Sequence, residues 1–79
     1  MNCQEFVKGL DPRGVRGLAE RLGLSVQAVG KWGRLGWIPD DRIPSIISTH
    51  PSNHPLDREV LDSFSFTAYR ESLVQAIEA

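Results

Sequence analysis

The side chains with the clearest chemistry to offer are Gln27, Lys31 and Arg34, which recur at helical spacing shortly after Ser25. Their chemistry is hydrogen bonding and charge. A glutamine amide donates and accepts hydrogen bonds at once, and a cationic side chain pairs with a phosphate or with the acceptor atoms of a base edge. Such a combination on one helix face is typical of a surface that binds a nucleic acid.

The sequence lacks the clusters of nucleophilic, acid–base or metal-ligating side chains that catalysis or metal binding would need. The single Cys3 excludes an internal disulfide, and its apolar neighbours favour a packing role. His50 and His54 are four residues apart, but Pro51 and Pro55 interrupt any helix there, and no third ligand is evident. We therefore expect no enzyme activity, no metal or other cofactor, and no small-molecule ligand.

Two short helices joined by a tight turn, from Val15 to Arg34, must position the polar face. Gly23 follows the apolar residues of the first helix at a place that suits the left-handed conformation. Ser25 then caps a second helix over residues 26–35. The apolar residues that hold the pair together are predicted to be Leu18, Ala19, Leu22, Leu24, Val29 and Trp32.

This spacing resembles the helix-turn-helix of the Cro/CI-like phage and prophage repressors. With Val15 as the first motif position, the small residue Ala19 is the fifth and the turn residue Gly23 is the ninth. The passage WGRLGWIPDDRIPSI also resembles the Trp-basic-Gly-x-Ile-Pro segment that leads many of these proteins into their next helix. The resemblance covers roughly residues 1–49 and implies a recognition helix that enters the DNA major groove.

The resemblance implies contact roles for individual residues. Gln27 would contact an adenine edge, Val26 a thymine methyl group, and Lys31 or Arg34 a guanine or a phosphate. The implied base-contacting set is Val26, Gln27, Gly30, Lys31 and Arg34, and the implied phosphate-contacting set is Arg13, Arg16 and Ser25.

Gly30 departs from the family pattern, which places a polar side chain at this position. Two interpretations stay open. The missing side chain either allows a close approach to DNA or accommodates packing together with Gly33.

Further capping residues, prolines and glycines predict the remaining helices of the first half. Asn2 and Glu5 form a capping-box start for a first helix whose apolar side is Cys3, Phe6, Val7 and Leu10. Asp11-Pro12 starts the next helix near Arg13, and Gly36 ends the recognition helix. Trp37 is predicted to pack, and Asp40 or Asp41 to start a fourth helix with Pro44 in its first turn and with Ile43, Ile46 and Ile47 closing the domain.

The second half reads as a hinge followed by a packing segment, so we divide the chain into residues 1–49 and 50–79. Residues 48–55 are polar and rich in proline. A short helix around Leu56, Val60 and Leu61 precedes a last helix capped by Ser65 or Thr67, although a short strand at 63–67 is an alternative. The last helix carries a stripe that either packs within the chain or forms a homodimer: Phe66, Tyr69, Leu73, Val74 and Ile77.

The length and the charge distribution of the chain limit which fold classes and which binding partners are plausible. The 79 residues suffice for a single small all-α domain of four to five short helices with a helical tail. Residues 1–39 hold six Lys or Arg against three Asp or Glu, whereas residues 40–79 hold three against seven. A basic half backed by an acidic half suits a DNA-binding protein despite the net charge of −1.

The leading hypothesis is a sequence-specific transcriptional regulator, a Cro-like repressor that binds a palindromic operator in double-stranded DNA as a homodimer. The alternatives are an excisionase-like recombination factor and an antagonist that binds another regulator through its acidic half. We expect a cytoplasmic protein of a bacterial host cell, because no segment resembles a secretion signal or a membrane span.

Overall fold

Local signals in the sequence set the ends of the first three helices. The structure is a computed structural model that describes residues 1–78. The N–H of Glu5 donates to Asn2 Oδ1 at 2.8 Å and starts α1 (Cys3–Lys8). α2 (Gly14–Leu22) ends at Gly23, whose φ of 68° is left-handed. α3 (Val26–Leu35) starts at Ser25, whose Oγ accepts a hydrogen bond from the Ala28 N–H at 3.1 Å, and it ends at Gly36 with φ 89°.

The second half of the described chain is also helical. A single 3-10 turn (Asp40–Arg42) leads into α4 (Ile43–Thr49), with Pro44 in its first turn as predicted. Asp57 caps α5 (Arg58–Ser63). Ser65 caps α6 (Phe66–Glu78), because its Oγ accepts from the Ala68 N–H at 3.1 Å. The predicted all-α class is confirmed, with six α-helices over residues 1–78.

One hydrophobic core joins both halves of the sequence. Leu61 of α5 is fully buried, and the ring centroid of Phe64 lies 5.2 Å from that of Phe6 in α1. Residues that were assigned to the second segment therefore pack on the first, and the division at residue 49 stays a prediction. The core residues are Cys3, Phe6, Val7, Leu10, Leu18, Ala19, Val29, Trp32, Ile38, Ile46 and Leu61.

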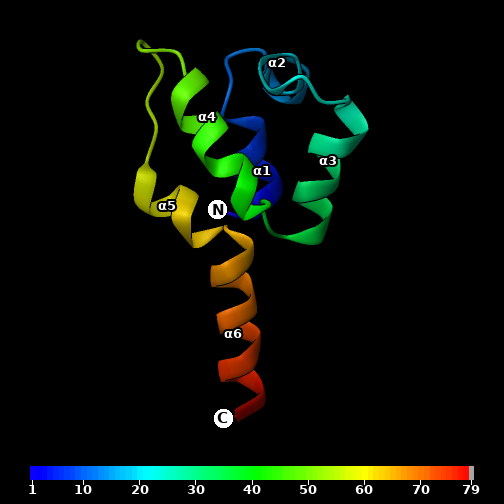
Figure 1. Cartoon of the computed structure of the whole chain (residues 1–79), viewed down its shortest axis with the longest axis vertical. Coiled ribbons are helices and arrows are strands. Elements are labelled where there is room, and N and C mark those ends of the chain that lie inside the picture. Colours follow the sequence, from blue (N-terminus) through cyan, green and yellow to red (C-terminus); the bar gives the residue numbers. More distant parts are fainter. Residues whose placement is uncertain (79) are drawn as a thin grey trace.

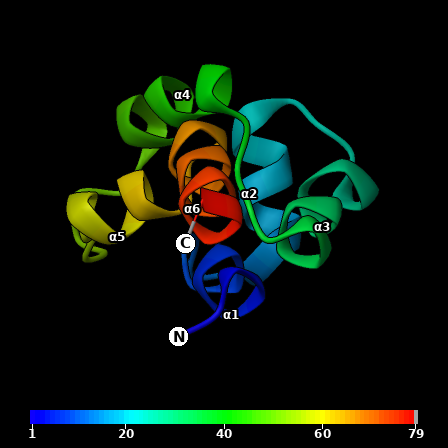
Figure 2. The same ribbon diagram turned by 90° about the horizontal axis from the view of Figure 1, so that it is seen from below.

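α6 stands apart from the other helices. Figure 1 shows α1 to α5 gathered at one end of the molecule, with α6 extending away from them. Seen from below, α6 is viewed end-on and the other helices surround its axis (Figure 2). The principal extents are 40 × 24 × 22 Å, and α6 accounts for the long axis. Within residues 1–78, no helix has the length and apolar character that a membrane span requires.

The start of α6 is fixed to the connection between α3 and α4. The Ile38 N–H donates to the Phe64 carbonyl at 2.7 Å, and the Phe66 N–H donates to the Ile38 carbonyl at 2.9 Å. This pairing is an isolated bridge between Ile38 and Ser65. The alternative of a strand at 63–67 is therefore wrong for the described chain, because a single bridge has no further partner with which to extend.

Asp40 caps a different helix from the predicted one. Its carboxylate accepts hydrogen bonds from the hydroxyl and the N–H of Thr67, at the start of α6. These bonds hold the pKa of Asp40 below its usual value. α4 itself follows Arg42 without a side-chain cap, since the preceding 3-10 turn already supplies backbone hydrogen bonds.

Asp11 also differs from the expectation. α2 begins at Gly14, one residue later than predicted, and Asp11 turns inward, where its side chain is 3% exposed. Its Oδ1 accepts from the Arg13 N–H at 2.8 Å, and its Oδ2 accepts from Arg21 Nη1 at 3.1 Å. Burial alone would raise the pKa of Asp11, but these hydrogen bonds and the two arginine charges lower it below its usual value.

Arg21 ties three elements together around Asp11. Its Nη1 also donates to the Leu10 carbonyl at 3.0 Å, and its Nη2 donates to the Ile46 carbonyl of α4 at 3.2 Å. Gly17 makes room for this cluster, because a Cβ there would lie 2.1 Å from Asp11 Oδ1. The orientation of α2 relative to α1 and α4 thus depends on a buried ion pair.

The histidine-containing loop between α4 and α5 is tied back onto α1. His54 Nε2 hydrogen-bonds to the Gly9 carbonyl at 2.7 Å, and His50 Nε2 hydrogen-bonds to the His54 carbonyl at 2.7 Å. Both histidines are therefore turn residues, as predicted. Among the described residues, no cluster of three His, Cys, Asp or Glu side chains could hold a metal ion.

Candidate nucleic-acid interface

The turn between α2 and α3 fixes the direction of the candidate recognition helix. The Leu24 N–H donates to the Ala19 carbonyl at 2.9 Å, which closes the end of α2 before Ser25 opens α3. Val29 and Trp32 of α3 are buried with Leu18 of α2. Because one side of α3 is held in the core, the opposite side must face solvent.

Gly33 brings α1 against α3, a packing partner that the sequence alone does not identify. A Cβ on Gly33 would lie 2.9 Å from the Cα of Gln4, so only glycine allows this approach without a shift of α1. Cys3 lies at the same contact, and its Sγ is 3.5 Å from the Trp32 carbonyl. Burial raises the pKa of Cys3, and its place in the core confirms the predicted packing role.

The polar face of α3 is exposed. Gln27, Lys31 and Arg34 are all exposed, and 45% of Val26 is accessible. No acidic residue occurs in the sequence between Glu20 and Asp40. This face therefore presents one glutamine and two cations without a carboxylate on its own helix, which favours contact with an anionic surface.

A hollow of about 360 Å³ lies along this face and includes residues of α1. It brings together four of the five predicted base-contacting residues, namely Val26, Gln27, Gly30 and Arg34. Lys31 is exposed but lies outside the hollow. The other lining residues are Gln4, Val7, Lys8, Val15 and Gly33.

Lys8 is a functional candidate that the sequence pattern did not predict. It belongs to α1, outside the helix-turn-helix, and it reaches the hollow because Gly33 lets α1 approach α3. A signal for it existed: Gln4 and Lys8 are four residues apart, so they share one side of α1 next to its apolar stripe. The sequence of α1 alone does not show which helix lies beside Gln4 and Lys8.

The surroundings of Gly30 favour one of the two interpretations of this residue. A Cβ on Gly30 would meet only Arg34 Nη1, at 3.7 Å, which is ordinary contact distance. Packing within the domain therefore does not require glycine here, whereas packing does require it at Gly33. The missing side chain leaves the floor of the hollow open beside the Arg34 guanidinium.

The three predicted phosphate-contacting residues differ in whether their side chains already form ion pairs or hydrogen bonds within the protein. Arg16 is exposed on α2. Arg13 Nη1 instead pairs with Glu20 Oε2 at 2.9 Å, and its Nε lies 3.6 Å from Asp11 Oδ1. Ser25 is exposed, and although its Oγ caps α3, its hydroxyl hydrogen can still be donated.

The predicted dimerisation residues divide into two groups. Tyr69 is half-buried, and its ring centroid lies 6.4 Å from that of Trp37, while Phe66 contacts Trp37 edge-on at 4.7 Å. These contacts confirm the packing role of Trp37. Leu73, Val74 and Ile77 are exposed further along α6.

Comparison with known proteins does not add a relationship to this geometry: no protein family, curated protein or solved structure matches the chain.

Proposed function

We propose that this protein is a sequence-specific DNA-binding transcriptional regulator, a Cro-like repressor of phage or prophage type that covers a promoter as a homodimer. One observation carries the proposal. A pair of helices joined at Gly23 exposes Gln27, Lys31 and Arg34 on a helix face without a carboxylate. In a helix-turn-helix, this is the face that enters the major groove.

The contacts follow from this docking mode. The exposed start of α3 would bring Gln27 to an adenine edge and Val26 to a thymine methyl group. The open floor at Gly30 lets the backbone of α3 approach the bases closely, with Arg34 beside it. Lys31 and Arg34 then contact a guanine edge or the phosphates on either side of the groove.

Phosphate contacts come from the elements that flank α3. Arg16 of α2 is an exposed cation, and the exposed Lys8 of α1 lines the hollow along the α3 face. Arg13 must exchange its pairing with Glu20 for a phosphate, so it contributes less than Arg16. Ser25 can donate its hydroxyl hydrogen to a phosphate oxygen.

Two alanine variants and a control test the division between base and phosphate contacts. Arg16→Ala should weaken binding to every duplex alike and reduce the slope of log K against log salt by about 0.9. Gln27→Ala should relax the preference at one base pair, where it costs about 1–3 kcal/mol of discrimination. Arg58→Ala removes an exposed cation from α5, in the acidic half, and should leave binding unchanged.

The measurement is fluorescence anisotropy with an operator duplex and a set of single-base variants at several salt concentrations. A uniform loss of affinity in both the Gln27→Ala and the Arg16→Ala proteins would contradict base contact by Gln27. Equal losses for Arg16→Ala and Arg58→Ala would contradict the placement of the DNA on the α3 face.

A further inference from the structure

α6 exposes a stripe of apolar side chains that the described chain does not cover. The members of this α6 stripe are Phe66, Leu73, Val74 and Ile77, which are 38%, 47%, 45% and 84% exposed. Every residue from Arg70 to Ile77 is exposed, and Figure 1 shows this part of α6 extending away from the other helices. Only the first turn of α6 is anchored, through Asp40, Ile38 and Trp37.

A helix in this situation needs a partner. Isolated helices shorter than about 12–15 residues are only marginally stable in water, and most helical stability in proteins comes from packing an apolar face. α6 has 13 residues and packs only its first turn. The α6 stripe is therefore a surface whose burial would stabilise α6 itself.

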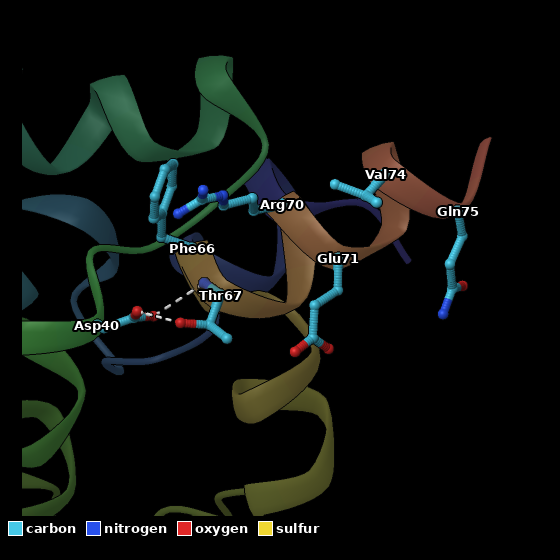
Figure 3. Close-up of a pocket in the computed structure, with 7 residues that line it drawn as sticks. All are labelled: Asp40, Phe66, Thr67, Arg70, Glu71, Val74 and Gln75. Carbon is cyan, nitrogen blue, oxygen red and sulfur yellow. Dashed lines mark hydrogen bonds between the residues drawn. The ribbon is translucent and has the colours of Figure 1, made fainter. Parts of the chain in front are cut away.

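The N-terminal end of α6, which we call its root, lies beside Trp37 and Asp40 and has two hollows that a partner could occupy. A hollow of about 560 Å³ extends from Asp40 and Phe66 along one side of α6 as far as Gln75. A second hollow of about 340 Å³ is lined by Trp37, Pro39, Asp40, Asp41 and Phe66. The two hollows share Asp40 and Phe66. In Figure 3, Arg70 extends toward Phe66, while Glu71 points away from it.

We propose that α6 pairs with α6 of a second copy in antiparallel orientation, with Ile77 of each copy against Phe66 and Trp37 at the root of the other. The stripe is complementary to itself in this orientation. If the twofold axis passes between residues 71 and 72, Phe66 lies opposite Ile77, Tyr69 opposite Val74, and Arg70 opposite Leu73. The most exposed apolar side chain then meets the apolar root of α6.

A parallel pair is less favourable on two grounds. It would place Ile77 of each copy beside Ile77 of the other, away from the hollows that Trp37, Asp40 and Phe66 line. An antiparallel pair also aligns the two helix dipoles favourably.

The available area is close to the minimum for a specific dimer. The α6 stripe exposes roughly 400 Å² of apolar surface per copy, which is comparable to the largest patches on monomeric proteins. Two stripes together with the rims of the hollows bury on the order of 1,000 Å², the lower limit for a biological interface. The pair should therefore dissociate on dilution. This inference rests on the homodimer of the proposed function but does not require DNA.

Sedimentation equilibrium from about 1 to about 500 µM protein, without DNA, tests the pairing. The wild type should show a monomer–dimer equilibrium. Ile77→Asp should raise the dissociation constant at least about 30-fold, because it brings a charge into the apolar contact. Ser72→Asp adds the same charge outside the stripe and both hollows, and it should change the constant no more than about three-fold.

Disulfide trapping tests the orientation. A mixture of Phe66→Cys and Ile77→Cys proteins should form a mixed disulfide, whereas Ile77→Cys alone should not link to itself, because antiparallel Ile77 positions are about 16 Å apart along the helices. A wild type that stays monomeric, or equal effects of the two aspartate variants, would overturn the pairing. Linking of Ile77→Cys alone would overturn its antiparallel orientation. Binding to a single half-site is measured separately, so a failed dimer is distinguishable from failed DNA binding.

Discussion

A methyl group added at Gly30 should stabilise the domain, whereas the same group added at Gly33 should destabilise it. At Gly30 the new Cβ meets only Arg34 Nη1, at 3.7 Å. Replacing glycine by alanine inside a helix gains up to about 1 kcal/mol. Gly30→Ala should therefore raise the free energy of unfolding by about 0.5–1 kcal/mol. For a domain of this size, each kcal/mol of added stability raises Tm by about 4–8 °C.

At Gly33 the same propensity gain is opposed by a collision. The new Cβ lies 2.9 Å from the Cα of Gln4 and 3.1 Å from its Cβ, so the backbone of α1 must move away from α3. Overpacking of this kind costs about 1–3 kcal/mol. The net effect of Gly33→Ala should be a loss of up to about 2 kcal/mol.

Urea and thermal denaturation of both variants and the wild type, followed by circular dichroism, measure the two effects. Since both variants make the same substitution in the same helix, they control for helix propensity, and only the surroundings differ. A Gly33→Ala protein as stable as Gly30→Ala would refute the close contact between α1 and α3, and with it the placement of Lys8 beside α3.

Two further predictions concern the charged groups. Because the folded pKa of Asp11 is lowered, its ionised form stabilises the domain above its ordinary pKa near 4, and this contribution is lost as the pH falls below that value. Asp11→Asn should cost about 2 kcal/mol or more near neutral pH, with a smaller difference from wild type at about pH 2, as measured by urea denaturation. Glu20→Gln releases Arg13 from its carboxylate and should strengthen DNA binding a few-fold at low salt. Unchanged affinity would show that Arg13 does not contact DNA.

The sequence predicted those parts of the fold that depend on local geometry. Gly23 and Gly36 need positive φ, and Ser25 caps with its own side chain, so each signal is complete within a few residues. The roles of Asp11 and Asp40 were harder to predict, because a carboxylate near a helix start can cap that helix or form a hydrogen bond or ion pair elsewhere. Their partners, Arg21 and Thr67, are 10 and 27 residues away in the sequence.

The candidate interface was predictable within the helix-turn-helix but not beyond it. Helical spacing places Gln27, Lys31 and Arg34 on one face because this follows from 3.6 residues per turn. The contribution of Lys8 depends on how α1 packs against Gly33, a tertiary contact that no local pattern encodes. The distinction between Gly30 and Gly33 likewise required the surroundings of each missing Cβ.

Selection from a random pool of duplexes, followed by sequencing, is the sharpest test of DNA binding by this protein. We expect retention at ~50 mM salt, where phosphate contacts are strongest, and enrichment of a palindrome whose half-sites are about one helical turn apart. Absence of any retained duplex under these conditions would contradict DNA binding and would favour a protein partner for the acidic half.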